Sequence, residues 1–92
     1  MRTIHLLVKG KVQGVFFRVT ARDKALKLGL NGWVANTEDH HVEMMVTGEP
    51  GPMKKFIEWC HIGPVTAKVE AVVENEISAQ LFSGFIIKSE KR

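Results

Sequence analysis

Residues 8–25, VKGKVQGVFFRVTARDKA, change from the residue pattern of a strand to that of a helix across a turn with two glycines. Upstream, apolar side chains alternate with others over residues 3–9, which is the period of a β-strand. Downstream, good helix formers gather over 18–28, and Gly29 is suited to end that helix. The stretch therefore predicts a strand, a glycine-containing loop and a helix.

The rest of the chain continues with alternating strand and helix patterns. Residues 30–37 and 41–48 are predicted to be two strands joined by a turn, and 49–52 a loop with a proline suited to a first helical turn. A helix follows, because its apolar residues fall at i, i+3, i+4 and i+7, namely Met53, Phe56, Ile57 and Cys60. Residues 67–74 alternate as another strand, with Ala67, Val69, Ala71 and Val73 on one face, and a short last strand is expected within 82–88.

This order, β-α-β-β-α-β with an extra strand, predicts an α+β fold of the ferredoxin-like type. We expect a sandwich with an antiparallel sheet, two helices on one of its faces and a short extra C-terminal strand. Residues 1–92 are expected to form a single domain, because two would be too small here. The end, 89–92, is expected to be frayed and solvated. Many functions share such a fold, so it does not by itself define the chemistry.

Composition narrows the classes of partner. The net charge of +3 favours anions such as phosphates, acidic metabolites or nucleic acid, but no run of five like charges suggests a tail for DNA or membrane binding. No apolar stretch approaches the roughly 20 residues needed to cross a bilayer, and no cleavage site follows the N-terminal apolar run. One cysteine and four histidines show no zinc-site spacing. A cytoplasmic location is expected.

The loop after the first strand has the features of a small anion site. Gly14 can take a positive φ, which lets successive N–H groups turn inward just before a helix N-terminus. Free N–H groups and the helix dipole favour a phosphate or carboxylate there, and Arg18 adds a charged fork for two oxygens. Gln13 is expected to add a side-chain or backbone donor, and at least one of Phe16 and Phe17 to pack beneath the loop. Spacing alone leaves open an ordinary turn followed by a solvated arginine.

The segment VKGKVQGVFFR, 8–18, resembles the signature of acylphosphatases, small enzymes that hydrolyse carboxyl–phosphate mixed anhydrides. A second similar motif, GWVANTEDHHVEMMVTG, follows at 32–48, and the Gly-Pro pair at 63–64 is also similar. The resemblance spans nearly the whole chain. It implies the same ferredoxin-like fold, an acyl phosphate as the small-molecule substrate, no metal and no organic cofactor. Inorganic phosphate, which is the product of that reaction, is expected to inhibit competitively.

The resemblance also implies roles for individual residues. The phosphate-binding loop would consist of Gln13, Gly14, Val15, Phe16, Phe17 and Arg18. Arg18 would be the essential arginine and Asn36 the catalytic asparagine. Since the carboxylate is a good leaving group, the site has only to hold the phosphoryl group, absorb its charge and place a water in line. Asn36 can orient that water with its donor and acceptor groups, so we assign no side-chain base and no nucleophile, Cys60 included.

One position departs from the family's pattern. His40 stands where acylphosphatases usually have a glycine, at the tip of the turn between the second and third strands. The turn is expected to be slightly strained, by about 1 kcal/mol, since a positive φ suits glycine better than histidine. His40 and His41 are both expected to be exposed, and neither to bind a metal.

The same fold also occurs in two other functional classes. An RNA-binding sheet would carry aromatic residues on its central strands, but 41–48 has none and the chain has no tyrosine, so no nucleic-acid partner is expected. A catalytically inactive anion-binding or regulatory domain of the same fold is the alternative. The presence of both Arg18 and Asn36 favours an enzyme, which is expected to be a monomer.

Overall fold

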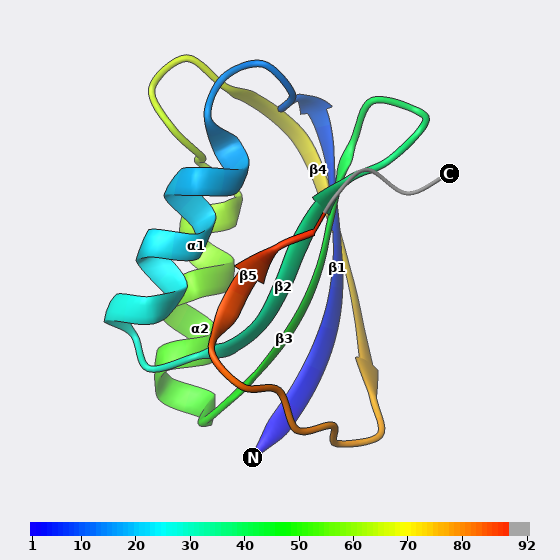
Figure 1. Cartoon of the computed structure of the whole chain (residues 1–92). Coiled ribbons are helices and arrows are strands. Elements are labelled where there is room, and N and C mark those ends of the chain that lie inside the picture. The colour runs from blue at the N-terminus through cyan, green and yellow to red at the C-terminus, as the bar shows by residue number, and fades with distance from the viewer. Residues whose placement is uncertain (89–92) are drawn as a thin grey trace.

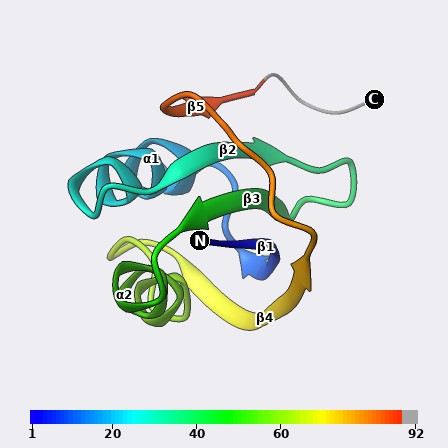
Figure 2. The same ribbon diagram turned by 90° about the horizontal axis from the view of Figure 1, so that it is seen from below.

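The computed structural model describes residues 1–88; the frayed end predicted for 89–92 lies outside them. Both helices cover the same face of one sheet, as Figures 1 and 2 show. This arrangement confirms the predicted α+β, ferredoxin-like fold. The elements in chain order are β1 (Arg2–Lys11), α1 (Phe17–Lys27), β2 (Asn31–Asn36), β3 (Val42–Gly48), α2 (Pro50–Cys60), β4 (Lys68–Ile77) and β5 (Phe85–Ile87).

The sheet has the strand order β4-β1-β3-β2-β5. The pairs β4–β1, β1–β3 and β3–β2 are antiparallel, as predicted. The extra strand β5 instead pairs in parallel with β2, so the sheet as a whole is mixed and the expectation of an antiparallel sheet fails for this pair. The reason is the connection after β4, which passes the ends of the other strands before β5 begins beside the start of β2 (Figure 2).

The core lies between the helices and the sheet, with the predicted period-two faces of β1 and β3 at its centre. The buried side chains of the two strands face each other in the pairs Ile4–Val46, Leu6–Met44 and Val8–Val42. The predicted stripe of α2 covers them, with Met53, Phe56 and Cys60 buried. The helix α1 adds Phe17, Ala21 and Ala25, and the two alanines let it lie close to the sheet. Gly29 has a φ of 72° just past α1, as expected for a helix end.

The strand β4 does not follow the alternation that was predicted for residues 67–74. Lys9 pairs with Ala71 but Gly10 pairs with Val69, so Glu70 is an extra residue and β4 contains a bulge. The bulge turns Val72 rather than Val73 toward the core, and the predicted alternation across 67–74 is therefore wrong. A side chain at Gly10 would place its Cβ 2.2 Å from the Lys68 carbonyl oxygen, so only glycine fits there.

The turn between β2 and β3 has the strain that its sequence predicts. His40 has a φ of 70°, in the left-handed region. The turn is held by Thr37, whose backbone N–H donates to the His41 carbonyl (2.9 Å) and whose hydroxyl accepts from the His41 N–H (3.0 Å) and donates to the Asp39 carboxylate. Histidine therefore occupies a backbone conformation that favours glycine.

Replacing His40 with glycine is expected to raise the free energy of unfolding by about 0.5–1 kcal/mol, because relief of the left-handed strain exceeds the added chain entropy. Urea denaturation followed by circular dichroism measures the change. Glu38→Gly is the matched control: Glu38 is exposed in the same turn without a positive φ, so this variant should be destabilised. A His40→Gly variant no more stable than the parent protein would show that the strain at this turn does not exceed the entropy cost of glycine.

The two helices of residues 1–88 are both too short to cross a membrane.

Candidate active site

The loop between β1 and α1 is held from below by buried apolar side chains. Val12 and Val15 are both in the core, so the chain between them is fixed at each side of Gly14. Gly14 has a φ of 73°, and a Cβ added to it would meet no other atom within 4 Å. The predicted positive φ is therefore confirmed, and glycine is required there by its backbone conformation rather than by lack of space.

The helix α1 begins at Phe17 with the features expected of an anion site. No acidic residue lies in its first turn. Thr20 is the first residue whose N–H bonds back into the helix, to the Phe16 carbonyl (3.1 Å), so the N–H groups before it have no partner within the helix. These groups and the positive end of the helix dipole favour an anion at the loop.

Phe16 and Phe17 lie on opposite sides of the loop backbone. Phe17 is buried and packs against Trp59, with ring centroids 5.3 Å apart, which confirms that one phenylalanine supports the loop from beneath. Phe16 is 79% exposed and has a φ of 62°. The left-handed conformation at Phe16 turns its ring outward as the helix begins.

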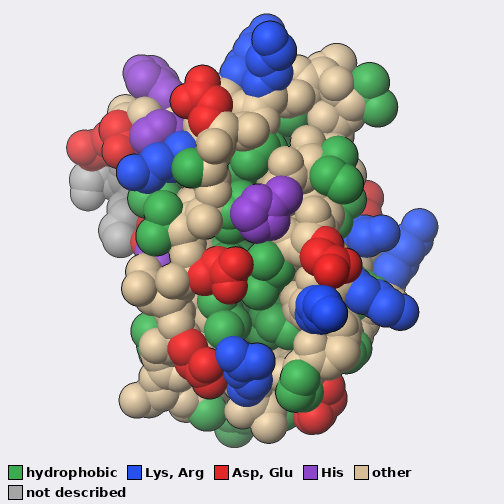
Figure 3. Space-filling model, turned by 180° about the vertical axis from the view of Figure 1, so that it is seen from behind, with side chains coloured by type: hydrophobic (Ala, Val, Ile, Leu, Met, Phe, Trp, Pro, Cys, Tyr) green, Lys and Arg blue, Asp and Glu red, His purple; other side chains and the backbone are tan. Residues whose placement is uncertain are grey.

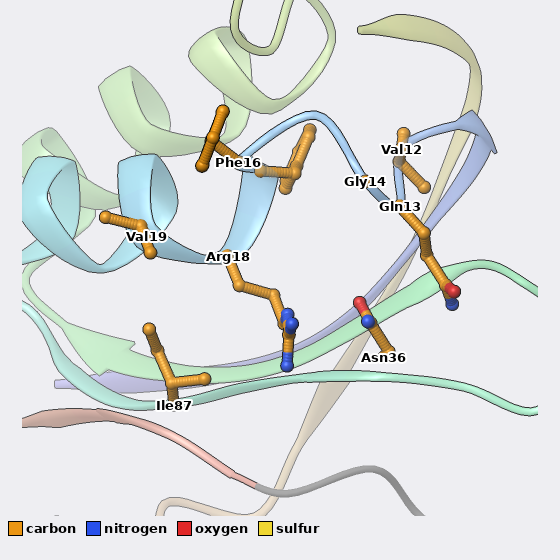
Figure 4. Close-up of a pocket in the computed structure, with 9 residues that line it drawn as sticks. Val12, Gln13, Gly14, Phe16, Arg18, Val19, Asn36 and Ile87 are labelled. Carbon is orange, nitrogen blue, oxygen red and sulfur yellow. The ribbon is translucent and has the colours of Figure 1, made fainter.

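Arg18 extends from the first turn of α1 into the cavity next to the loop (Figure 4). Its side chain is half-buried, and among residues 1–88 it has neither an ion-pair nor a hydrogen-bond partner. By contrast, Arg2 pairs with Glu76 and Arg22 with Asp23. The guanidinium of Arg18 is therefore a cation that the described part of the protein leaves free to bind an anion.

Asn36, the last residue of β2, faces the same cavity. Its side-chain amide lies toward the end of Arg18 in Figure 4. The residue is 6% exposed, and its Oδ1 is buried without a hydrogen-bond partner among the described residues. Because buried polar atoms are rarely left unpaired, this acceptor is best explained by a ligand or a water in the cavity.

Gln13 has a different role from a side-chain donor to the anion. Its Nε2 donates to the carbonyl oxygens of Thr37 (3.1 Å) and His41 (2.8 Å), and both hydrogens of the amide are thereby used. The side-chain amide of Gln13 is therefore not free to donate to an anion, and only its backbone N–H remains for that role. The side chain instead ties the loop to the β2–β3 turn that follows Asn36. Val15 likewise directs its side chain into the core, so it too can offer only its backbone.

The cavity has a volume of about 280 Å³ and is lined by both polar and apolar residues. The polar residues that line it are Gln13, Gly14, Arg18 and Asn36, and the apolar ones are Val12, Phe16, Phe17, Val19 and Ile87. The structure thus brings together the predicted site residues other than Val15. Sequence reasoning missed Val12, Val19 and Ile87. Val19 could have been found from the sequence, because it follows Arg18 in the predicted helix. Nothing in the sequence marks Ile87 as a site residue, because its position depends on the pairing of β5 with β2.

A second hollow of about 490 Å³ lies between α2 and the strands β1 and β4. Figure 3 shows apolar side chains in it, with charged side chains of both signs around them. Its mixed charges favour an anion less than the first cavity does. None of the motif residues is among those that line it, which are Arg2, Ile4, Pro50, Met53, Lys54, Ile57, Glu58, His61 and Glu74.

The remaining reactive side chains lie away from the cavity. Cys60 is fully buried, and burial raises the pKa of its thiol, so no reactive thiolate is available there. Within residues 1–88, no group of three His, Cys, Asp or Glu side chains is arranged to hold a metal ion. His40 is exposed as predicted, but His41 is half-buried, 3.4 Å from the Asp39 carboxylate, so the prediction for His41 is wrong. The turn is joined to the loop by the hydrogen bonds of Gln13 to the backbone carbonyls of Thr37 and His41.

Comparison with known proteins gives one consistent result. The family model described as acylphosphatase matches residues 4–87. An acylphosphatase of Marinobacter nauticus is 50% identical over 82 residues, which are 88% of this chain and 89% of that protein. The structure of an acylphosphatase from Coxiella burnetii superposes with a TM-score of 0.91 at 41% identity, over 95% of this chain and 92% of that one. The acylphosphatase from Bacillus subtilis superposes with a TM-score of 0.93 at 32% identity, over 96% and 99% of the two chains.

Proposed function

The chain belongs to the acylphosphatase family, and from this premise we propose how its own residues hydrolyse acyl phosphates. The reaction breaks the bond between phosphorus and the acyl oxygen and releases a carboxylate and inorganic phosphate. Arg18 and Asn36 are the proposed catalytic residues. The observation that carries the proposal is the pairing in one cavity of a free guanidinium with a buried, unpartnered amide oxygen.

In this proposal the phosphoryl group binds at the loop before α1. Backbone N–H groups from Gln13 to Arg18 donate to its oxygens, and the guanidinium of Arg18 binds two of them with its fork. The left-handed φ at Gly14 and the free N–H groups of the first helical turn support this role. These donors are fixed before the substrate arrives, so they stabilise the charge that develops during transfer without reorganising.

Asn36 is proposed to position the attacking water. Its Oδ1 accepts a hydrogen bond from the water and directs the water oxygen at phosphorus, opposite the acyl oxygen. As the new P–O bond forms, the electrons of the breaking bond leave with the carboxylate. The proton of the water passes to a phosphate oxygen. No side-chain base is required, because the phosphate oxygen takes that proton, and no side-chain acid is required, because the carboxylate is a weak base and leaves without protonation.

Other expectations from the sequence remain proposals. We propose that residues 1–92 act as a single domain and a monomer, in the cytoplasm. Catalysis is proposed to need no metal, because Arg18 and the loop amides supply the positive charge that a metal ion would otherwise provide. The alternative, an inactive anion-binding domain, would bind phosphate at the same loop but would not hydrolyse an acyl phosphate.

Inorganic phosphate is expected to inhibit hydrolysis of benzoyl phosphate competitively, because it occupies the loop and Arg18 but not the position of the acyl group. Initial rates at several phosphate concentrations should show a raised KM and an unchanged kcat. The same assay in EDTA should give the same rate as without it. Loss of activity in EDTA would contradict the metal-free mechanism, and phosphate binding without any hydrolysis would favour the inactive domain.

A further inference from the structure

We propose that Gln13 is a positioning residue, whose side chain holds Asn36 in place relative to the phosphate-binding loop. The inference rests on the proposed function, since it takes the phosphoryl group to bind at the loop and the attacking water to bind at Asn36. It gives the Gln13 side chain a role in the reaction that needs no contact with the substrate, because the side chain acts through Asn36.

The side chain of Asn36 has no hydrogen-bonded support of its own. Its Oδ1 is buried without a partner among the described residues. Asn36 is also the last residue of β2, where the pairing with β3 ends at Val42. The direction of its amide therefore depends on the turn that follows, residues 37–41. A displacement of the amide and its water by about 1 Å can lower a rate by about 10²-fold.

Gln13 connects this turn to the phosphate-binding loop. Figure 4 shows its side chain extending from the loop in the direction of the strand that carries Asn36. Its Nε2 donates to the carbonyl oxygens of Thr37 (3.1 Å) and His41 (2.8 Å), so one amide group binds both ends of the turn. The reverse orientation would place Oε1 against two carbonyl oxygens, so these partners also fix the orientation of the amide. Within residues 1–88, no backbone hydrogen bond joins 12–16 to 37–41.

The two carbonyl groups have other donors besides Gln13. The Thr37 oxygen also accepts from the His40 N–H (3.2 Å), and the His41 oxygen accepts from the Thr37 N–H (2.9 Å). Removing the Gln13 amide would leave neither carbonyl without a donor, so the fold should lose little stability. The change would instead remove the constraint on the distance between the turn and the loop.

The loop keeps its shape through separate contacts. Val12 and Val15 are buried in the core on either side of Gly14, and these contacts do not depend on the amide of Gln13. Loss of that amide should therefore leave the phosphate-binding N–H groups in place and change the position of Asn36. The expected effect is on turnover and not on phosphate binding.

Gln13→Met removes both donors and keeps the length of the side chain. We expect kcat for benzoyl phosphate to fall about tenfold, while KM and the inhibition constant of inorganic phosphate change by less than about twofold. Gln80→Met is the matched control, because Gln80 is exposed and forms its hydrogen bonds to Thr3 and Thr47 with its backbone. It should keep the parent's kcat. Gln13→Ala gives the same test if the methionine variant folds poorly.

A double-mutant cycle distinguishes positioning of Asn36 from a general structural effect. In Asn36→Ala there is no amide to position, so adding Gln13→Met should lower kcat by less than about twofold in that protein. A loss of stability, in contrast, would be present in both backgrounds, and the thermal midpoints of the four proteins would show it. An unchanged kcat in Gln13→Met, an equal tenfold fall in both backgrounds, or weaker phosphate binding in Gln13→Met would overturn the proposal.

A measurement without turnover separates this proposal from the proposed function. In proton–nitrogen NMR correlation spectra, the side-chain amide signals of Asn36 should shift or broaden in Gln13→Met, while the backbone signal of Arg18 keeps its parent position. If the parent protein hydrolyses benzoyl phosphate but the Asn36 signals do not change, the positioning role is wrong and the proposed function stands. If the signals change but the parent does not hydrolyse an acyl phosphate, the proposed function fails and the link from Gln13 to Asn36 is confirmed.

Discussion

Arg18→Ala is expected to lower kcat/KM for benzoyl phosphate by about 10³-fold, because it removes both the charge and the fork that hold the phosphoryl group. The loss should be present in kcat and in KM, since the same contact holds the bound substrate and the transition state. The inhibition constant of inorganic phosphate should rise in parallel. Arg18 makes no hydrogen bond or ion pair with the other described residues, so the variant should keep the parent's circular dichroism spectrum and thermal midpoint.

Arg22→Ala is the matched control for this variant. Arg22 lies one turn further along α1 and is half-buried like Arg18, but it pairs with Asp23 and is not among the residues that line the cavity. Both substitutions lower the net charge by one, so a general electrostatic effect would appear in both. Arg18→Lys should recover only part of the activity, because lysine restores the charge without the planar fork. Activity of Arg18→Ala within a few-fold of the parent would rule out the proposed binding role.

The position of Arg18 was predictable because local patterns determine it. The period of the apolar residues changes from two to 3.6 within a few positions, so the first helical turn must follow the loop directly. Gly14 marks where the backbone needs a positive φ. These are properties of neighbouring residues, and the structure adds only the direction of the side chain.

The position of Asn36 was much less predictable from local patterns. An asparagine at a strand end is common, and whether it faces the helices or the solvent depends on the register between β2 and β3. The register is set by the cross-strand pairs of β2 and β3, such as Val34–Met44, and by the turn at His40 that joins the two strands. The resemblance to the family singled out this residue, and its spacing alone did not.

Three features could not be predicted because they depend on long-range pairing. The bulge at Glu70 leaves no mark in the alternation of its own strand and exists because Gly10, far away in the chain, admits a close approach. The side chain of Gln13 bonds to the β2–β3 turn only once the sheet has brought the two loops together. Ile87 reaches the cavity because β5 pairs with β2, a partner that a three-residue strand does not specify.

Asn36→Ala is expected to lower kcat by about 10²-fold or more while KM and the inhibition constant of phosphate change by less than about threefold. The reason is that Asn36 is proposed to hold the water and not the phosphoryl group. The fold should tolerate the change, since the Asn36 side chain makes no hydrogen bond to residues 1–88 and its removal leaves no partner unpaired. Steady-state kinetics with benzoyl phosphate, together with thermal unfolding, test each part.

Asn31→Ala is the matched control, because Asn31 is the same residue type at the opposite end of β2 and is not among the residues that line the cavity. It should keep the parent's kcat. The two catalytic variants should differ in phosphate binding: Arg18→Ala should bind phosphate weakly, whereas Asn36→Ala should bind phosphate normally and turn over slowly. If Asn36→Ala instead lost phosphate affinity along with kcat, the asparagine would be part of the phosphate-binding loop's function, and the water would need another residue to position it.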